Sequence, residues 1–592
     1  MARIADWGGH DSGYGSVLVT SKHRSINQPF TKRLIMNTVT ILLSSFILSI
    51  TGLFIFIWSL RKRLFDNTAA AAYVIFSDGE IGRGEEPAAT AAQLEGMRQQ
   101  VPGQASAVLT AAQETTLARE LEERVEADRS TAFVSFVFLS CAVVWLVVGS
   151  LAGLTSSIKL HQPDWLVQQA WLTFGRIRTI HLNIVAYGWA PMASFGIANW
   201  LLPRLLKTPL VGGRYAIFGC MLWNAGLIAG VGCIAAGISD GMEWLEMPWQ
   251  VDILIVIGGA LRGLPLVYTL QARKVDHLYV SVWYMGAALF WFPILFFIAK
   301  LPALHFGVEQ ATMNWWYGHN VLGLFYTPMA LASVYYFLPK IIGRPVQSYN
   351  LSLLGFWTLA FFYGQVGGHH LVGGPVPAWL ITLSIVQSIM MIVPVISFSI
   401  NQHLTMRGYF SKLIYSPTLR FLVLGGMMYT LSSLEGTFEA LRSVSTVAHF
   451  THFTVAHAHL GLYGFFTMVM FGAIYFVMPR VMSWEWPYPS LIAVHFWLVI
   501  IGFAIYFVGL SIGGWLQGMA MLDASKPFID SVNVTIPFLK SRTVGGSLMT
   551  LGHLVFAGHF IAMALRYGPA RTGAALLHTG VTASATDQLA GA

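Results

Sequence analysis

The sequence is poor in charged residues and in cysteine, and each shortage excludes a class of protein. Only 10% of its 592 residues are Asp, Glu, Lys or Arg, while 55% are hydrophobic; soluble domains carry about 25% charged residues. The three cysteines, Cys141, Cys220 and Cys233, form no CxxC pair. The chain therefore has no CxxCH site for a covalent c-type haem, and its composition indicates an integral membrane protein.

The apolar residues are grouped into long stretches. About thirteen of these approach the roughly twenty residues that a helix needs to cross a bilayer. They lie at approximately 35–60, 131–157, 180–202, 214–238, 251–272, 278–300, 312–339, 351–372, 376–402, 419–437, 448–478, 490–518 and 543–565. The residues before the first stretch are polar, so no cleavable signal peptide is expected. The sequence predicts an all-α, multi-pass protein embedded in the lipid bilayer.

These stretches divide the chain into four parts. Residues 1–34 form a polar N-terminal tail, and residues 35–128 combine one extra transmembrane helix with a polar arm. Residues 129–570 contain only spans and short loops, which is typical of one twelve-helix domain, and residues 571–592 form a C-terminal tail. The simplest interpretation of the extra helix is an accessory anchor.

The net charge of +8 is explained by membrane topology, and no nucleic-acid partner is expected. Positive residues collect on the cytoplasmic side of membrane proteins, and basic loops recur at alternate turns of this chain. They contain Arg204, Lys207 and Arg214; Arg273 and Lys274; Lys340 and Arg344; Arg407, Lys412 and Arg420; and Arg480. This pattern predicts that these loops, the polar arm and the C-terminus lie in the cytoplasm, at a bacterial-type inner membrane. The basic N-terminal tail would then lie outside, against the rule.

Two histidines lie in the middle of one apolar stretch, AHFTHFTVAHAHLGLYGFF. His457 and His459 are two positions apart, which corresponds to about 200° around a helix. Their imidazoles therefore point to nearly opposite sides and cannot bind the same metal. Ionisable residues at membrane depth are costly and usually functional, so we expect this helix to stand between two metal centres.

Four further histidines are predicted to lie at a similar depth: His181, His319, and the adjacent His369 and His370. Neutral imidazole is a good ligand for copper, iron and zinc. Three histidines from two helices could hold a non-haem metal, and single axial histidines hold b-type haem. The alternative is a structural network of buried histidines. His495, His553 and His559 also lie within spans but are isolated, and we expect them to be polar side chains packed between helices.

Several motifs together resemble one family. FGRIRTIHLN, EWLEMPWQVDI, NWWYGHN, YYFLPKIIGRPVQSYNLS, GGHH, LEGTFEALRSV and AHAHLG are distributed over roughly residues 130–565. The sequence is similar to the catalytic subunit of the haem–copper oxygen reductases, specifically the C-type (cbb3-type) cytochrome c oxidases and their relatives, the nitric oxide reductases. The extra span and its arm resemble the single-span assembly proteins of cbb3-type oxidases.

The resemblance implies a role for each of the six histidines. His319, His369 and His370 match the three ligands of the copper ion called CuB. His457 matches the axial ligand of the high-spin haem b, and His181 and His459 match the two ligands of the low-spin haem b. The resemblance also implies haem-propionate contacts from Arg178 and Arg542, a calcium ligand at Glu246, and a proton pathway through Thr327, Tyr335, Tyr349 and Ser352.

The resemblance favours copper over iron at the non-haem site. Nitric oxide reductases carry a glutamate four residues after the first metal histidine, where this chain has Gly323, and residues 384–399 contain no carboxylate. Tyr363, seven residues before His370, matches the tyrosine that supplies a proton and an electron in cbb3-type oxidases. Some residues depart from the oxidase pattern: Gln365 replaces a tryptophan, Gly355 replaces a histidine, and AHAHLGLYGFF is closer to the nitric oxide reductases.

The resemblance therefore implies a terminal oxidase subunit that reduces O2 to water. Electrons would come from cytochrome c through membrane-anchored c-type cytochrome subunits, and protons would be taken up from the cytoplasm and in part pumped. One alternative is a nitric oxide reductase with a haem/non-haem metal centre. The other is a non-catalytic membrane protein with structural histidines.

Overall fold

A computed structural model describes residues 50, 52–62, 68–77, 80–82, 84–99, 111–301 and 304–568. The chain divides into two units, 1–46 and 47–592, and only the second contains described residues. The predicted tails at 1–34 and 571–592 lie outside the described residues. Of the predicted span at 35–60, the structure describes little more than the short apolar helix Gly52–Arg61.

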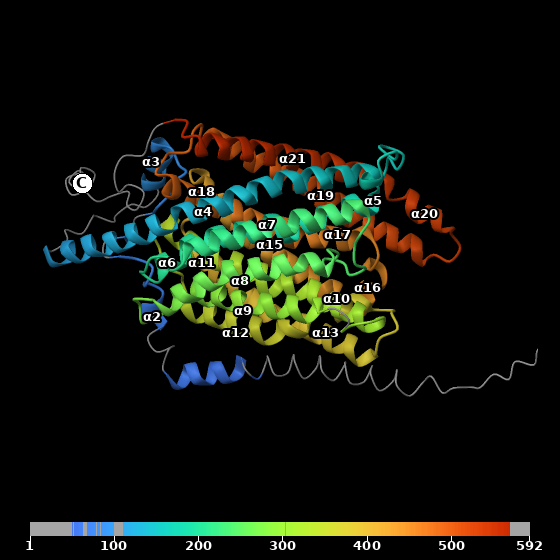
Figure 1. Ribbon diagram of the computed structural model, residues 1–592, viewed down its shortest axis with the longest axis horizontal. Coiled ribbons are helices and arrows are strands. Elements are labelled where there is room, and N and C mark those ends of the chain that lie inside the picture. Colours follow the sequence, from blue (N-terminus) through green and yellow to red (C-terminus); the bar gives the residue numbers. More distant parts are fainter. Residues whose placement is uncertain are drawn as a thin grey trace, which may run out of the picture. The chain divides into compact units, whose positions relative to one another are not determined.

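The described part of the second unit is a bundle of long helical segments (Figure 1). Nine of the described helices are long and apolar enough to cross a membrane. The long segments are α4 (Ala111–Lys159), α5 (Phe174–Asn183) continued by η2 (Ile184–Trp189) and α6 (Ala190–Leu205), α7 (Gly213–Ala236), α8 (Trp249–Gln271), α9 (Val280–Lys300), α10 (Val308–Val321) continued by η3 (Leu322–Tyr326) and α11 (Thr327–Ile342), α12 (Tyr349–Phe362), α13 (Ala378–Met390) with α14 (Ile392–Met406), α15 (Pro417–Glu439), α17 (His452–His459) continued by η7 (Leu460–Thr467) and α18 (Met468–Met482), α19 (Ser490–Leu522) and α21 (Ile536–Ala564). The predicted all-α membrane fold is confirmed.

The remaining described elements are short. They are α2 (Thr68–Ala71), α3 (Ala91–Gln99), η1 (Ala170–Leu172), η4 (Tyr363–Gln365), η5 (Gly368–Leu371), η6 (Phe410–Ile414), α16 (Arg442–Ala448) and α20 (Phe528–Asn533). Two of them, η4 and η5, break a span that the sequence predicted as one helix over 351–372. The break occurs because Gly367 has φ = +119°, which is not helical, and a Cβ there would lie 2.5 Å from the carbonyl oxygen of Trp315.

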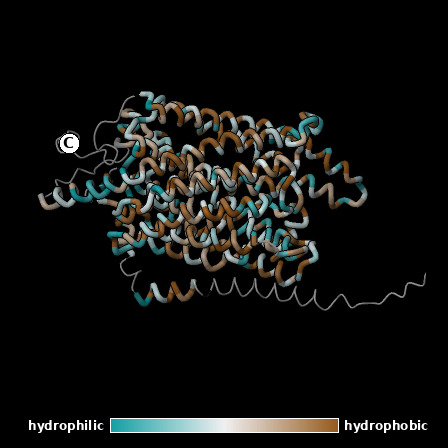
Figure 2. The backbone as a smooth tube through the Cα atoms, viewed as in Figure 1, coloured by the Kyte–Doolittle hydropathy of each residue, from teal (hydrophilic) through white to brown (hydrophobic). Residues whose placement is uncertain are grey.

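The burial of the helices separates a central group from a lipid-facing group. In the span Val308–Ile342, and again in His452–Met482, 89% of the apolar window is buried, against 33% in Trp249–Gln271. Apolar residues run along the middle of the helices and polar residues gather toward their ends (Figure 2). Helices α10–α11 and α17–α18 therefore form the centre of the bundle, while α8 presents apolar side chains outward as a lipid-facing helix does.

Three helices contain a π-helical stretch directly after a histidine-bearing turn. These stretches are η2 after His181, η3 after His319 and η7 after His459. A π-helical turn inserts an extra residue into the helical repeat and is frequently found at functional sites. The sequence did not reveal these irregularities, because their residues are ordinary apolar and glycine residues. They change which side chains below each histidine face the centre of the bundle.

The polar arm packs on the end of the bundle that carries Arg204, Lys340 and Arg480, here called the basic end. Glu85 Oε2 accepts a hydrogen bond from Arg480 Nη2 at 2.7 Å, and Glu80 Oε2 accepts one from Lys340 Nζ at 2.9 Å. Asp128, on α4, pairs with Arg204 at 2.8 Å. The sequence suggested an exposed helix here, but these carboxylates are buried against the basic loops. Moreover, α4 begins at Ala111, so the end of the arm and the first core span form one helix.

Candidate metal and haem site

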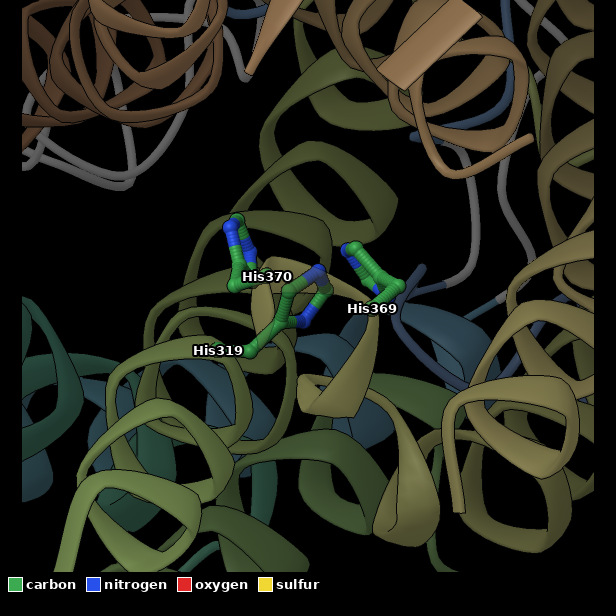
Figure 3. A group of neighbouring side chains, drawn as sticks. All are labelled: His319, His369 and His370. Carbon is green, nitrogen blue, oxygen red and sulfur yellow. The ribbon is translucent and has the colours of Figure 1, made fainter. Parts of the chain in front are cut away.

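Three histidine side chains converge at one point of the bundle (Figure 3). His319 comes from α10, while His369 and His370 come from η5, and their ligand nitrogens all lie within 4.8 Å of one another. The ring centre of His319 lies 4.9 Å from that of His369 and 5.3 Å from that of His370. Among the residues that the structure describes, this is the group of His, Cys, Asp and Glu that could share a metal ion.

Neighbouring side chains orient these imidazoles. His369 Nδ1 lies 3.1 Å from Ser384 Oγ and 3.2 Å from Ser388 Oγ, and the ring of His370 stacks on Trp315 at 4.4 Å. Hydrogen bonds to the non-ligating nitrogen are typical of metal-bound histidine. His319 Nδ1 is buried and has no hydrogen-bond partner, which fits a nitrogen that binds a metal. The donor set of three imidazoles suits copper.

Tyr363 lies beside this centre. Its ring centre is 5.4 Å from that of His319. A Cβ built on Gly323 would fall 1.8 Å from Tyr363 Cζ, so the tyrosine occupies the space next to that glycine. The sequence reasoning identified both residues but not this contact, because it depends on how η3 and η4 pack together.

The two histidines of α17 point to different partners, as helix geometry predicts. His457 Nδ1 lies 3.2 Å from Glu435 Oε2 on α15, and its ring lies so close to Gly436 that a Cβ there would be 2.8 Å from His457 Cε1. His459 instead faces α19, where Tyr506 OH lies 3.2 Å from its Nε2. The glutamate leaves His457 Nε2 available for an axial bond. Glu435 was not identified from the sequence, although it stands in the LEGTFEALRSV motif.

His459 faces His181 across a cavity. Their rings are nearly parallel, at 9°, with centres 6.4 Å apart. An imidazole nitrogen binds a metal at about 2 Å, so two imidazoles on opposite sides of one metal have ring centres roughly 6 Å apart. His181 Nδ1 donates to the Gly149 carbonyl and His459 Nδ1 to the Val455 carbonyl, both at 2.8 Å. Each Nε2 is therefore the free ligand atom.

The cavity around this pair fits a planar cofactor. It contains about 960 Å³ of space not filled by protein atoms, and its lining is mostly apolar. His181 fits against Gly153, where a Cβ would lie 2.7 Å from the ring. Cofactor sites are typically concave and apolar with a few placed polar groups. Two parallel axial nitrogens in such a cavity fit a six-coordinate haem.

The predicted propionate arginines have different surroundings. Arg542 lines the cavity and lies over the ring of Tyr506, 5.5 Å from its centre, with Nε buried and unpaired. Arg178 pairs with Glu243 and is 41% exposed. Arg542 is therefore brought to the cavity, while Arg178 is engaged by a loop carboxylate.

The calcium candidate, Glu246, is in the loop between α7 and α8. Its Oε2 accepts a hydrogen bond from Asn183 Nδ2 at 2.8 Å, and burial raises the pKa of its carboxyl. Asn183 Oδ1 is buried without a partner. Two oxygens thus lie near each other, and hard cations prefer oxygen ligands.

The predicted proton-pathway residues lie on two adjoining parts of the bundle. Tyr335 OH is buried without a hydrogen-bond partner, and Ser352 Oγ accepts a hydrogen bond from Asn401 Nδ2 at 2.9 Å. Tyr349 OH lies 3.2 Å from His277 Nε2. Thr327 begins α11, directly after η3. Asn401 and His277 were not predicted, since single polar residues at span ends carry no distinctive pattern.

A bundle of membrane helices with a three-histidine centre and two further histidine sites defines a class of redox protein that holds several metals. The profile of the family described as Cytochrome C and Quinol oxidase polypeptide I matches residues 134–548. The chain belongs to this family. The expectation of an oxidase subunit I, a membrane-bound oxidoreductase of electron transport, is thereby confirmed at the level of the family.

Individual relatives agree with this assignment. The chain is 33% identical over 436 residues to the cbb3-type cytochrome c oxidase subunit CcoN1 of Stutzerimonas stutzeri, covering 71% of this chain and 92% of that protein. It is 31% identical to cytochrome c oxidase subunit 1 of Rhodobacter capsulatus, covering 70% and 82%. A nitric oxide reductase polypeptide of Stutzerimonas stutzeri is 23% identical, covering 72% and 93%. The resemblance to C-type oxidases is confirmed.

A solved structure also matches the fold. The chain aligns with a cryo-EM structure of a heme-copper terminal oxidase dimer with a TM-score of 0.59, covering 74% of this chain and 84% of that one. The sequence identity is 15%, so this likeness concerns the fold alone.

Proposed function

We propose that this chain is the catalytic subunit of a cbb3-type terminal oxidase, which reduces O2 to water with electrons from cytochrome c. The observation that carries the proposal is the position of Tyr363 beside His319, at the three-histidine centre and in the space next to Gly323. That arrangement offers a copper ion three imidazoles and a nearby phenol, and leaves no room for a carboxylate at position 323.

His319, His369 and His370 would hold CuB, with Ser384 and Ser388 fixing the ring of His369. His457 would hold a high-spin haem b, oriented by Glu435, and His181 with His459 would hold a low-spin haem b. Once bound, these groups supply the electron transfer and the oxygen chemistry. The protein's part is to set their positions, and His457 and His459 on one helix keep the two haems close together.

Tyr363 has the role of a proton and hydrogen-atom donor at the centre. Its phenol is buried beside His319, and its supply of protons would come through Ser352, Tyr335 and Thr327. The unpaired hydroxyl of Tyr335 supports this route, because a buried hydroxyl without a partner is costly and is commonly satisfied by water. Tyr349 and His277 would form the entrance at the basic end. Part of the protons taken up would be pumped.

The surroundings of the proposed subunit follow from its topology and its cofactors. With its basic loops in the cytoplasm, it would lie in the inner membrane of a bacterium. Since the chain has no CxxCH motif, membrane-anchored c-type cytochrome subunits would deliver the electrons. Arg542 and Arg178 would contact haem propionates, Glu246 with Asn183 would contribute oxygens to a calcium ion, and residues 35–128 would form an accessory module.

The test is turnover by the purified complex with each candidate substrate. Oxygen consumption driven by reduced cytochrome c, at a rate well above any consumption of nitric oxide, would support the oxidase. Nitric oxide consumption without oxygen consumption would establish the reductase instead. A purified complex with no haem absorbance would establish a non-catalytic protein.

A further inference from the structure

Three histidines that are isolated in the sequence form a buried row between α18, α19 and α21. His495 is on α19, and His553 and His559 are on α21; each is at most 4% exposed. Phe471 contacts the rings of His553 and His495, with centres 5.8 Å and 4.5 Å away. Tyr475 contacts the rings of His495 and His559, at 5.8 Å and 6.0 Å. No member of this row belongs to the three-histidine centre.

The upper member of the row, His553, borders the cavity between His181 and His459. Tyr463 OH lies 2.8 Å from His553 Nε2, and Ser150 Oγ lies 2.6 Å from its Nδ1. Tyr463, His553 and Ser150 all line that cavity. Because both ring nitrogens have hydroxyl partners, His553 can gain a proton at one nitrogen and lose one from the other.

The other two histidines each have one nitrogen without a partner. His495 Nδ1 lies 3.0 Å from Tyr475 OH, while its Nε2 is buried and unpaired. His559 Nε2 donates to the Pro487 carbonyl, while its Nδ1 is buried and unpaired. Leaving a buried polar atom unpaired costs about 1–3 kcal/mol. Two such atoms in one row indicate places for ordered water, which pairs buried polar groups.

The row runs along the helix axes from the basic end toward the cavity. Pro487 lies in the turn after α18, and the neighbouring Trp484 Nε1 donates to the carbonyl of Tyr567, beyond the end of α21, at 3.0 Å. His553 lies six residues before His559, or about 9 Å further along α21 at 1.5 Å per residue. The lower end of the row is therefore near the basic end, and its upper end is at the cavity.

We propose that His559, His495, His553 and Tyr463 form a second proton path, which delivers one proton beside the low-spin haem when that haem is reduced. It uses α18, α19 and α21 and so is separate from the route through Tyr335 and Ser352 on α11 and α12. This inference rests on the proposed function, since it assumes a haem between His181 and His459. One electron from the c-type cytochrome donor enters the haem, and one proton from the basic end is stored on the imidazole of His553.

The groups around the row are compatible with this role. Phe471 and Phe556 separate the imidazoles with apolar rings, and Phe556 lies 5.0 Å from His495. Such rings isolate a transferred proton from other acceptors. The charged side chain that faces the same cavity is Arg542, and it opposes a positive charge on His553 when the haem is oxidised. A negative charge added to the haem offsets that repulsion, which couples the proton to the electron.

The test is the pH dependence of the low-spin haem midpoint potential in the purified complex, measured by redox titration with absorbance detection. One proton taken up per electron changes the potential by about 59 mV per tenfold change in proton concentration. We expect a slope close to this value in the wild type and in Tyr335→Phe, the matched control from the other route. We expect a flattened slope in His553→Phe and in the milder variant His553→Gln.

A slope in both His553 variants equal to that of the wild type would overturn the proposal. A complex with no low-spin haem absorbance would instead contradict the proposed function, so the two failures are distinguishable. The lower part of the path has its own test, in which a pH-indicator dye follows proton uptake after rapid reduction. We expect at least tenfold slower uptake in His559→Phe with an unchanged equilibrium slope; unchanged kinetics would contradict the part assigned to His559.

Discussion

The ring of Tyr363 fills the space that a side chain at Gly323 would need, since a Cβ there would lie 1.8 Å from Tyr363 Cζ. The two residues come from different segments, η3 and η4, that meet beside His319. A residue with a carboxylate at position 323 and a tyrosine at this place are therefore mutually exclusive. The choice between two kinds of metal centre thus depends on one packing contact.

Replacing Gly323 with alanine should impair catalysis without removing the metals. The added methyl group displaces Tyr363, and a displacement of about 1 Å at a reacting group can cost roughly 100-fold in rate. We expect oxygen consumption to fall by about that factor, with haem absorbance retained. Gly364→Ala is the matched control, because a Cβ at Gly364 meets no atom within 4 Å. Equal losses in the two variants would argue against the contact.

Removing the hydroxyl groups behind His369 should weaken copper binding. Ser384 and Ser388 both lie within hydrogen-bond distance of His369 Nδ1, and loss of such a partner typically costs 10–100-fold in metal affinity, on the order of 1–3 kcal/mol. We expect Ser384→Ala to lose copper at chelator concentrations that leave the wild type loaded. Ser397→Ala is the control, since its hydroxyl bonds only the carbonyl of Val393 in its own helix. Identical copper retention in all three proteins would refute this orienting role.

The two faces of α17 should lose different haems. His457 contacts Glu435 on α15, and His459 contacts Tyr506 on α19. We expect His457→Ala to abolish the CO-difference spectrum while the low-spin absorbance persists. In His459→Ala we expect the low-spin absorbance to be lost first. If either variant removed both signals while the complex stayed assembled, the separate assignment would be wrong.

Acid should release the arm from the basic end. Burial raises the pKa of Glu85, but the charges of Lys340 and Arg480 outweigh it and hold that pKa below its usual range, with Glu80 opposing them. A lowered pKa means that the contribution of Glu85 is present above the pKa of the undocked carboxyl and is lost as the pH falls through the docked value. We expect proteolysis of the arm to increase as the pH is lowered below that of the free carboxyl, about 4.3.

The matched variant is Glu85→Gln. Removing one partner of a buried pair typically costs about 3–5 kcal/mol, so we expect the arm to be cleaved readily at neutral pH and a lower melting temperature for the complex. Glu95→Gln, in α3 of the same arm, is the comparison. Cleavage of Glu85→Gln with the pH profile of the wild type would show that this carboxylate does not hold the arm.

The sequence predicted the membrane class, the helical segments of the core and the opposite faces of His457 and His459, because these follow from apolar length and helical periodicity. It did not predict η2, η3 or η7, since π-helical turns have no distinctive composition. Nor did it predict the row of His495, His553 and His559, whose members come from two helices. Contacts between distant segments, such as Glu85 with Arg480, depend on packing that spacing alone does not encode.

The most direct test of the account is the metal content of the purified complex, with the iron of the c-type cytochrome subunits subtracted. The account predicts one copper and two irons per copy of this chain, with the copper lost in His370→Ala and both haems retained. Three irons and no copper in the wild-type protein would contradict it.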